Sequence, residues 1–188
     1  DNTRIVCSCV SLLTVLVSAG HMARRRAARE LGLLSAVGAL MRRPFDACSA
    51  SRVLWTFAYF GEDDTCMAIC CNRGMPVLLL SLFEQAVVDL DEVGLHGGCR
   101  FFLLVSDRPQ YFTVLLKQKP DLVERLLVAL ARREKLAAPN VMDALALVWR
   151  ALEQGLVVED AIGLSTRLVL MATQFVGHAP IQHLLKAC

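Results

Sequence analysis

Cysteine and histidine are the residues of this chain with the widest chemical range, and three cysteines lie close together. Cys66 and Cys70 are four residues apart, so a helix would place both thiols on one face, with Cys71 beside them. Together with His96 and Cys99 they supply the donor atoms that zinc prefers. However, the sequence contains neither a CxxC pair nor a close pair of histidines. We therefore expect buried structural thiols, with no metal and no cofactor.

Catalysis by a cysteine would need a base within reach, and the sequence selects no such pair. The four histidines are scattered along the chain: His21, His96, His178 and His183. Gly94, Gly97 and Gly98 lack the GxxxxGKS/T spacing of a phosphate-binding loop and a preceding strand. We expect instead that these glycines thin one side of a helix, so that a neighbouring helix can approach closely. The sequence therefore predicts no catalytic residues, no small-molecule substrate and no enzymatic activity.

Arginines form the strongest surface feature of the sequence, a basic patch that consists of Arg24, Arg25, Arg26 and Arg29. Residues 21–43 hold six arginines against one glutamate, although the net charge of the whole chain is only +2. Such a patch would contact RNA phosphates or an acidic protein surface. A solvated helix face explains the same residues, and no aromatic residues are interleaved with them as in many single-strand binding sites.

Composition indicates a thick apolar interior or additional faces that partners cover. Hydrophobic residues make up 55% of the 188 residues and charged residues 20%, which is apolar for a soluble monomer. Residues 5–23 form the longest uncharged run, but its apolar core is shorter than the roughly 20 residues of a membrane span. We expect a buried first helix and no membrane span. A chain with so many apolar residues can be stable without disulfides, although it has eight cysteines. We therefore expect a reducing intracellular compartment (cytoplasm, nucleus or an organelle matrix).

The fold class is predicted to be all-α, because apolar residues recur every three to four positions and hairpin signals are lacking. We expect one domain over residues 1–188, built from units at 21–63, 64–107 and 108–154. Each unit would contain a short helix, a second helix and a long helix. Residues 5–20 would be the last helix of a preceding unit, and residues 155–188 a C-terminal cap or a partial repeat.

Glycine and acidic residues mark the predicted connections between these helices. Turns are expected at Gly32 and Gly74, and an acidic loop is expected around residues 89–92. Because the chain opens with Asp1 rather than Met, we expect a fragment of a longer chain or a processed product.

Three bulky aromatic residues, Trp55, Phe102 and Trp149, recur at intervals of 47 residues. Each lies in the predicted long helix of its unit. A period of this size is typical of stacked helical repeats. None of the helices in such a unit can bury its apolar face alone, so neighbouring units must stack, and the stack usually binds partners. The period therefore directs attention to surfaces rather than to catalysis.

The units resemble armadillo repeats. The segment AICCNRGMPVLLLSL at residues 68–82 fits the turn and second helix of the family closely. The segment AARELGLLSAVGALM at residues 27–41 fits without the proline, and KQKPDLVERLLVAL at residues 117–130 keeps the helix but loses the glycine. The resemblance covers roughly residues 21–154. It implies a right-handed α-solenoid of about three armadillo-like repeats with flanking helices.

In armadillo proteins the third helices line a groove that binds extended partner segments. The import receptors of this family hold a peptide with a tryptophan and, one turn later, an asparagine. The matching pairs in this chain are Trp55 with Tyr59, Phe102 with Ser106, and Trp149 with Glu153. Because asparagine is missing from all three pairs, the import-receptor mode is not implied. The resemblance implies a non-enzymatic scaffold or a structural subunit of a larger assembly, which binds protein partners through this groove and edge surfaces.

The segment RVLWTFAYFG at residues 52–61 also resembles a helix of organellar RNA-binding helical-repeat proteins. Those repeats have two helices and a period shorter than 47 residues, whereas the Gly-Met-Pro turn at residues 74–76 favours the armadillo pattern. This second resemblance implies the alternative function, an RNA-binding module of an organellar ribonucleoprotein with the basic patch on phosphates.

Overall fold

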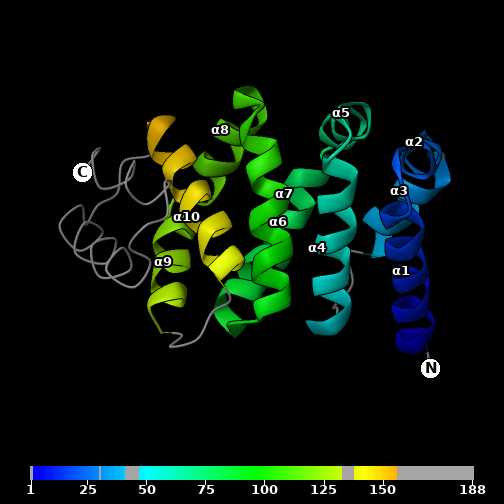
Figure 1. The fold of residues 1–188 in the computed structure, drawn as a ribbon, viewed down its shortest axis with the longest axis horizontal. Helices are drawn as coiled ribbons and strands as arrows, with labels where there is room; N and C mark the ends of the chain where they lie inside the picture. The colour runs from blue at the N-terminus through cyan, green and yellow to red at the C-terminus, as the bar shows by residue number, and fades with distance from the viewer. Residues whose placement is uncertain (1, 30, 41–46, 133–137, 156–188) are drawn as a thin grey trace.

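A computed structural model describes residues 2–29, 31–40, 47–132 and 138–155, and within these ranges every regular element is an α-helix (Figure 1). The all-α prediction is therefore confirmed for the described part of the chain. The helices are α1 (Asn2–Ser18), α2 (His21–Arg29), α3 (Leu31–Leu40), α4 (Ala47–Gly61), α5 (Asp64–Asn72), α6 (Met75–Asp89), α7 (Glu92–Ser106), α8 (Pro109–Gln118), α9 (Leu122–Arg132) and α10 (Ala138–Glu153).

Local signals in the sequence explain where several helices begin. The buried carboxylate of Asp63 accepts hydrogen bonds from the backbone N–H groups of Thr65 (3.0 Å) and Cys66 (3.1 Å), which caps α5. Gly74 adopts a left-handed conformation (φ 69°) between α5 and α6, as the predicted turn requires. Pro76 follows in the first turn of α6, where its missing N–H costs nothing.

The predicted turn at Gly32 is wrong, whereas the predicted acidic loop is present in a shorter form. Gly32 lies inside α3 rather than in a turn, since α2 ends at Arg29 and α3 begins at Leu31. The acidic loop is shorter than expected, because α6 continues to Asp89, where the side chain of Gln85 donates a hydrogen bond to the aspartate (2.8 Å). Leu90 then ends α6 in a left-handed conformation (φ 55°), and Asp91 immediately caps α7.

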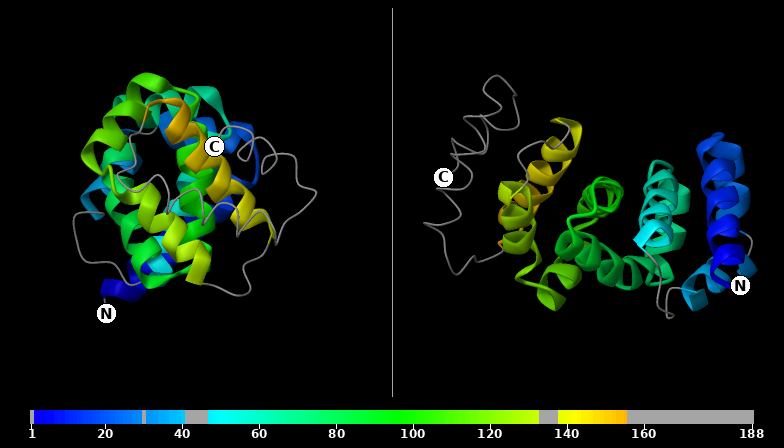
Figure 2. Two further views of the ribbon diagram at one scale, coloured as in Figure 1. Left: turned by 90° about the vertical axis from the view of Figure 1, so that its left-hand side faces the viewer. Right: turned by 90° about the horizontal axis from the view of Figure 1, so that it is seen from below.

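Four of the long helices follow one another along the molecule. In Figure 1, α1, α4, α7 and α10 lie in this order along the long axis, and each packs against the next. The view from below in Figure 2 shows the same progression from the N-terminal to the C-terminal helices. The other helices also make contacts along the row, because α2 packs on α5 and α6 packs on α9.

Aromatic side chains form the centre of the core. Phe57, Phe60, Phe83 and Phe101 are fully buried. The rings of Phe57 and Phe101 meet edge to face, with centroids 6.1 Å apart, which joins α4 to α7. This core is continuous from α1 to α10 within the described residues.

Glycines let α7 approach its neighbours, as the sequence predicts. A Cβ atom added at Gly97 would lie 3.0 Å from the backbone nitrogen of Trp55 in α4. A Cβ atom at Gly98 would lie 2.1 Å from Cδ2 of the buried Phe83 ring in α6. The contact at Gly98 leaves no room for a Cβ atom, and the contact at Gly97 is tight enough that the Trp55 backbone would have to shift by a few tenths of an ångström.

The first helix is buried on one side only, which corrects the expectation of a buried helix. Val10, Leu13 and Val17 are buried, whereas large apolar side chains on the rest of α1 are more than half exposed: Ile5, Leu12, Val15 and Leu16. Among the described helices, none is by itself long and apolar enough to cross a membrane. The pair α5 and α6 passes that test of length and composition together, but the two helices are bent by 91° at their junction.

Candidate functional site

Trp55 and Tyr59 lie one turn apart on α4, and both are half-buried. Their ring centroids are 5.7 Å apart. The guanidinium of Arg24 stands 5.6 Å from the centroid of the Tyr59 ring, so the aromatic pair also holds a cation from α2.

The predicted second pair does not lie at this surface. Phe102 is only 2% exposed and packs against the rings of Phe83 and Phe101. Ser106 is 3% exposed, and its hydroxyl donates a hydrogen bond to the carbonyl oxygen of Leu103 (2.6 Å). Both residues belong to the core, so neither is available to line a groove.

The difference comes from where each aromatic residue lies within its own helix. The sequence spacing of the aromatics is 47 residues, but α7 begins 45 residues after α4. An offset of two residues rotates a side chain by about 200° around a helix axis, which takes it to the opposite face. A count from the helix starts would have paired Trp55 with Arg100, whose side chain is 44% exposed.

The third predicted pair lies partly at the surface of α10. Trp149 is half-buried and packs against the core, and Glu153 is exposed. Glu153 pairs with Arg150 one turn earlier (3.5 Å), and Arg150 also reaches Asp107 at the end of α7 (3.3 Å). Glu153 therefore contributes to an ion-pair group at the helix ends.

Two residues that sequence reasoning missed connect Trp55 to α10. The imidazole of His96 on α7 stands edge-on to the Trp55 ring, with centroids 4.7 Å apart. Its Nε2 atom lies 3.4 Å from a carboxylate oxygen of Asp143 on α10, and both side chains are 25% exposed. We call the surface formed by Tyr59, Trp55, His96 and Asp143 the aromatic track. It crosses α4, α7 and α10.

Half of the predicted basic patch is used inside the molecule. Arg24 is 7% exposed, donates to the carbonyl oxygen of Val17 (2.6 Å) and pairs with Glu62 (2.8 Å). Arg25 pairs with the buried carboxylate of Asp63 (2.8 Å). Arg26 and Arg29 are exposed, and neither forms an ion pair with another described residue.

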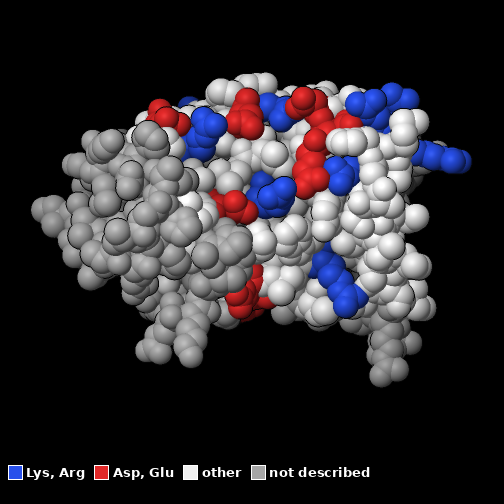
Figure 3. Space-filling model, viewed as in Figure 1, with Lys and Arg blue, Asp and Glu red and all other residues white. Residues whose placement is uncertain are grey.

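Glu62 links α2 to α7, because its carboxylate pairs both with Arg24 of α2 (2.8 Å) and with Arg100 of α7 (2.9 Å). Figure 3 shows the result on this face, where acidic and basic side chains alternate near the upper ends of the helices. Pairing of opposite charges at Arg24, Arg25 and Arg100 weakens the local field of these three arginines.

Asp63 is the most strongly held of these acids. Burial by itself would raise the pKa of its carboxyl group, but the Cys66 N–H hydrogen bond and Arg25 outweigh burial and hold the pKa below the ordinary value of 3.8. The carboxylate therefore remains charged and fixes α2 to the start of α5.

No family model, curated protein or solved structure matches the chain.

The predicted thiol cluster does not assemble into a metal centre. Cys66, Cys70, Cys71 and Cys99 are buried, and no group of three or more His, Cys, Asp or Glu in the described residues is placed to hold a metal ion. Burial raises the pKa of the Cys66 thiol to about 11 and raises those of the other three as well. These thiols are therefore protonated at neutral pH and poor nucleophiles. His178, His183 and Cys188 lie outside the described residues.

Proposed function

We propose that the chain is a non-enzymatic interaction scaffold, an armadillo-like right-handed solenoid of about three repeats with flanking helices. It would bind protein partners through the surface of α4, α7 and α10, as a subunit of a larger assembly in a reducing intracellular compartment. The observation that carries this proposal is the aromatic track, which crosses three long helices of successive units. The order of short, second and long helices supports the comparison with armadillo repeats.

The chemistry of the track suits an extended partner segment. Half-buried Trp and Tyr rings combine apolar surface with polar atoms at their edges, and such residues dominate the binding energy of many interfaces. His96 and Asp143 add polar groups beside the rings. The protein would therefore recognise a segment that places an apolar side chain on Trp55 and polar groups toward α10.

Quantitative affinity purification with single variants tests this proposal. Trp55→Ala and His96→Ala should each remove the same set of bound proteins from the eluate, because both residues lie in one surface. Val114→Lys is the matched control, since Val114 is 48% exposed on α8 and lies outside the track. Circular dichroism and thermal unfolding of each variant separate a lost surface from a lost fold. Equal partner recovery with wild type and both track variants would contradict the proposal.

The alternative function, RNA binding, draws its support from Arg26 and Arg29, the two arginines of the basic patch that have no ion-pair partner among the described residues. Nuclease treatment of the same samples distinguishes the two functions. If RNA co-purifies, if Arg26→Glu with Arg29→Glu abolishes that RNA, and if binding falls steeply with salt, the RNA-binding function replaces the scaffold. Partners that survive nuclease treatment support the scaffold.

A further inference from the structure

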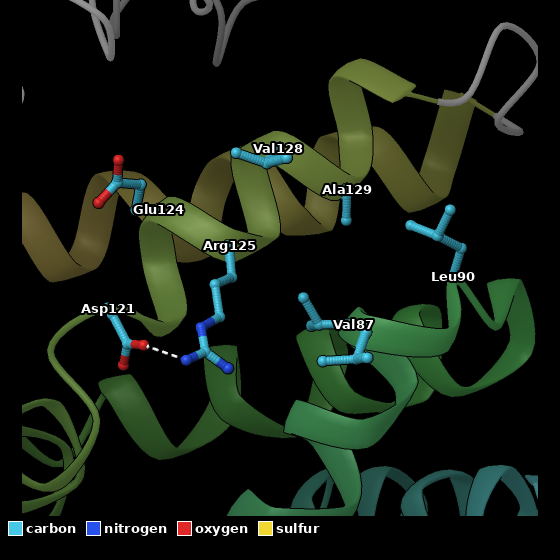
Figure 4. A pocket seen from close by; sticks show the side chains of 8 residues that line it. Val87, Leu90, Asp121, Glu124, Arg125, Val128 and Ala129 are labelled. Atoms are coloured by element: carbon cyan, nitrogen blue, oxygen red, sulfur yellow. Dashed lines mark ion pairs between the residues drawn. The ribbon is translucent and has the colours of Figure 1, made fainter.

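A hollow of about 500 Å³ lies between α6 and α9, on second helices of successive units and apart from the aromatic track (Figure 4). This volume is in the range of small-molecule and side-chain binding pockets. We call it the α6/α9 pocket. Its lining residues are Val87, Val88, Leu90, Asp121, Glu124, Arg125, Val128 and Ala129.

One part of the pocket is apolar and open to solvent. Val87 and Ala129 are buried, while Val88 is 59% exposed and therefore accessible to an incoming group. Leu90 lines the pocket from the left-handed position that ends α6 (φ 55°), where glycine or asparagine is usual. A positive φ is energetically unfavourable for leucine. The side chain of Leu90 adds apolar surface to the pocket.

The other part of the pocket is acidic. The guanidinium of Arg125 is held by Asp121 (2.6 Å) and by Glu84 (3.1 Å), so its charge is already compensated. Glu124 lines the same end, as Figure 4 shows, and forms no ion pair with another described residue. An occupant that fits both parts therefore combines an apolar group with a positive charge.

The chain carries such an element on its own surface. Met22 on α2 is 79% exposed, the largest exposure of any large apolar side chain in the described residues. Arg26 and Arg29 follow it at spacings of four and seven residues, so all three share one face of the helix. Both arginines are exposed and without ion-pair partners among the described residues.

We propose that the α6/α9 pocket binds α2 of a second copy of this chain, with Met22 in the apolar part and Arg26 or Arg29 on Glu124. The charges are complementary and the apolar groups match on both sides. Within one molecule, α2 and α9 lie toward opposite ends of the row of helices (Figure 1), so the contact joins different copies. Such a contact is heterologous: each copy offers one pocket and one α2, and copies add head to tail into chains rather than closed pairs.

Sedimentation of the full chain at low salt tests the contact. The wild type should show an average mass that rises with protein concentration. A variant with Met22→Glu and Arg26→Glu loses α2 as a ligand, and a variant with Val88→Lys and Glu124→Arg loses the pocket. Each variant alone should stay monomeric, because every head-to-tail contact needs both elements, and the affinity should fall by at least about ten-fold.

A mixture of the two variants gives the decisive result. The first variant retains an intact pocket and the second an intact α2, so the mixture should form one-to-one pairs and nothing larger. Val114→Lys on α8 is the matched control and should associate like the wild type. A salt increase from about 50 to about 500 mM should weaken association, since the arginine–glutamate contact is exposed.

Several results would overturn the proposal. They are a wild type that is monomeric at all concentrations, variants that associate like the wild type, or a mixture that stays monomeric although circular dichroism shows both variants folded. If a double variant fails to fold, two replacements serve the same purpose. Arg26→Glu with Arg29→Glu changes α2, and the single variant Glu124→Arg changes the pocket.

Discussion

The helix α4 has two sides that are built differently. We call the contacts of α1 and α2 with α4 and α5 the N-terminal boundary, and those of α4 and α6 with α7 the central boundary. At the N-terminal boundary the hydroxyls of Thr14 and Thr56 are 2.7 Å apart, and Arg52 donates to Ser11. At the central boundary Gly97 and Gly98 bring backbone and rings into close contact.

The difference concerns tolerance to movement. Hydroxyls and long charged side chains can adjust their positions while they keep a partner, whereas a glycine pressed against a ring has no such freedom. The central boundary should therefore fix the relative position of α4 and α7, on which the aromatic track depends. The N-terminal boundary should hold α1 and α2 less tightly, because its contacts are replaceable one at a time.

The largest expected effect tests the tight packing at the central boundary. Gly98→Ala would place a methyl group 2.1 Å from the Phe83 ring, and we expect a loss of about 2–3 kcal/mol in the free energy of unfolding even though alanine favours the helix. Urea unfolding measures the change. Gly38→Ala in α3 is the control, since the nearest atom there is the flexible end of Met75 at 3.4 Å. If both variants had the same free energy of unfolding, the central boundary would not be more tightly packed than the rest of the molecule.

An intermediate effect is expected at the buried charge of the N-terminal boundary. Asp63→Ala removes the cap of α5 and the partner of Arg25, which should cost about 2 kcal/mol at neutral pH. Because the folded pKa of Asp63 lies below 3.8, its contribution is complete above that pH and is lost as the pH falls through the folded pKa. Unfolding of wild type and variant should therefore converge in strong acid.

Asp64→Ala is the control for this prediction, because the Asp64 side chain is 99% exposed although it also pairs with an arginine. We expect little change in unfolding for this variant. A stability difference between wild type and Asp63→Ala that stays constant down to strong acid would show that the charge of Asp63 does not stabilise the boundary.

The smallest expected effect concerns the hydroxyl pair between α1 and α4. Thr56→Val keeps the shape of the side chain but removes its bonds to Thr14 and to the carbonyl oxygen of Arg52, which should cost about 1 kcal/mol. In a double-mutant cycle, the variant with Thr14→Val as well should cost less than the sum of the two single changes. Strict additivity in guanidinium unfolding would show that the pair does not couple the two helices.

Helix positions were predictable from this sequence because caps and breakers act locally. Asp63 before α5, Gly74 before α6 and Pro109 at the start of α8 each mark a helix boundary through their own backbone or side chain. Gly32 misled the prediction, since glycine lowers the stability of a helix by only about 1 kcal/mol relative to alanine and can therefore lie inside one.

The orientation of side chains was less predictable than the helices. Trp55 and Tyr59 are half-buried, whereas Phe102 is buried, because a two-residue difference in spacing reverses the face of a helix. The partners of Arg24 and Arg25 lie 38 residues away in sequence, so a local charge count could not reveal that Glu62 and Asp63 neutralise them.

The buried thiols can report local opening of the structure. A protonated, inaccessible cysteine reacts with an alkylating reagent only after the surrounding structure has opened, so each modified thiol marks a past opening event. Cys66, Cys70 and Cys71 lie in α5 beside the N-terminal boundary, and Cys99 lies in α7 at the central one. Mass spectrometry of the wild-type protein after increasing times of alkylation would give the order in which these thiols are labelled. That order shows which part of the molecule opens first.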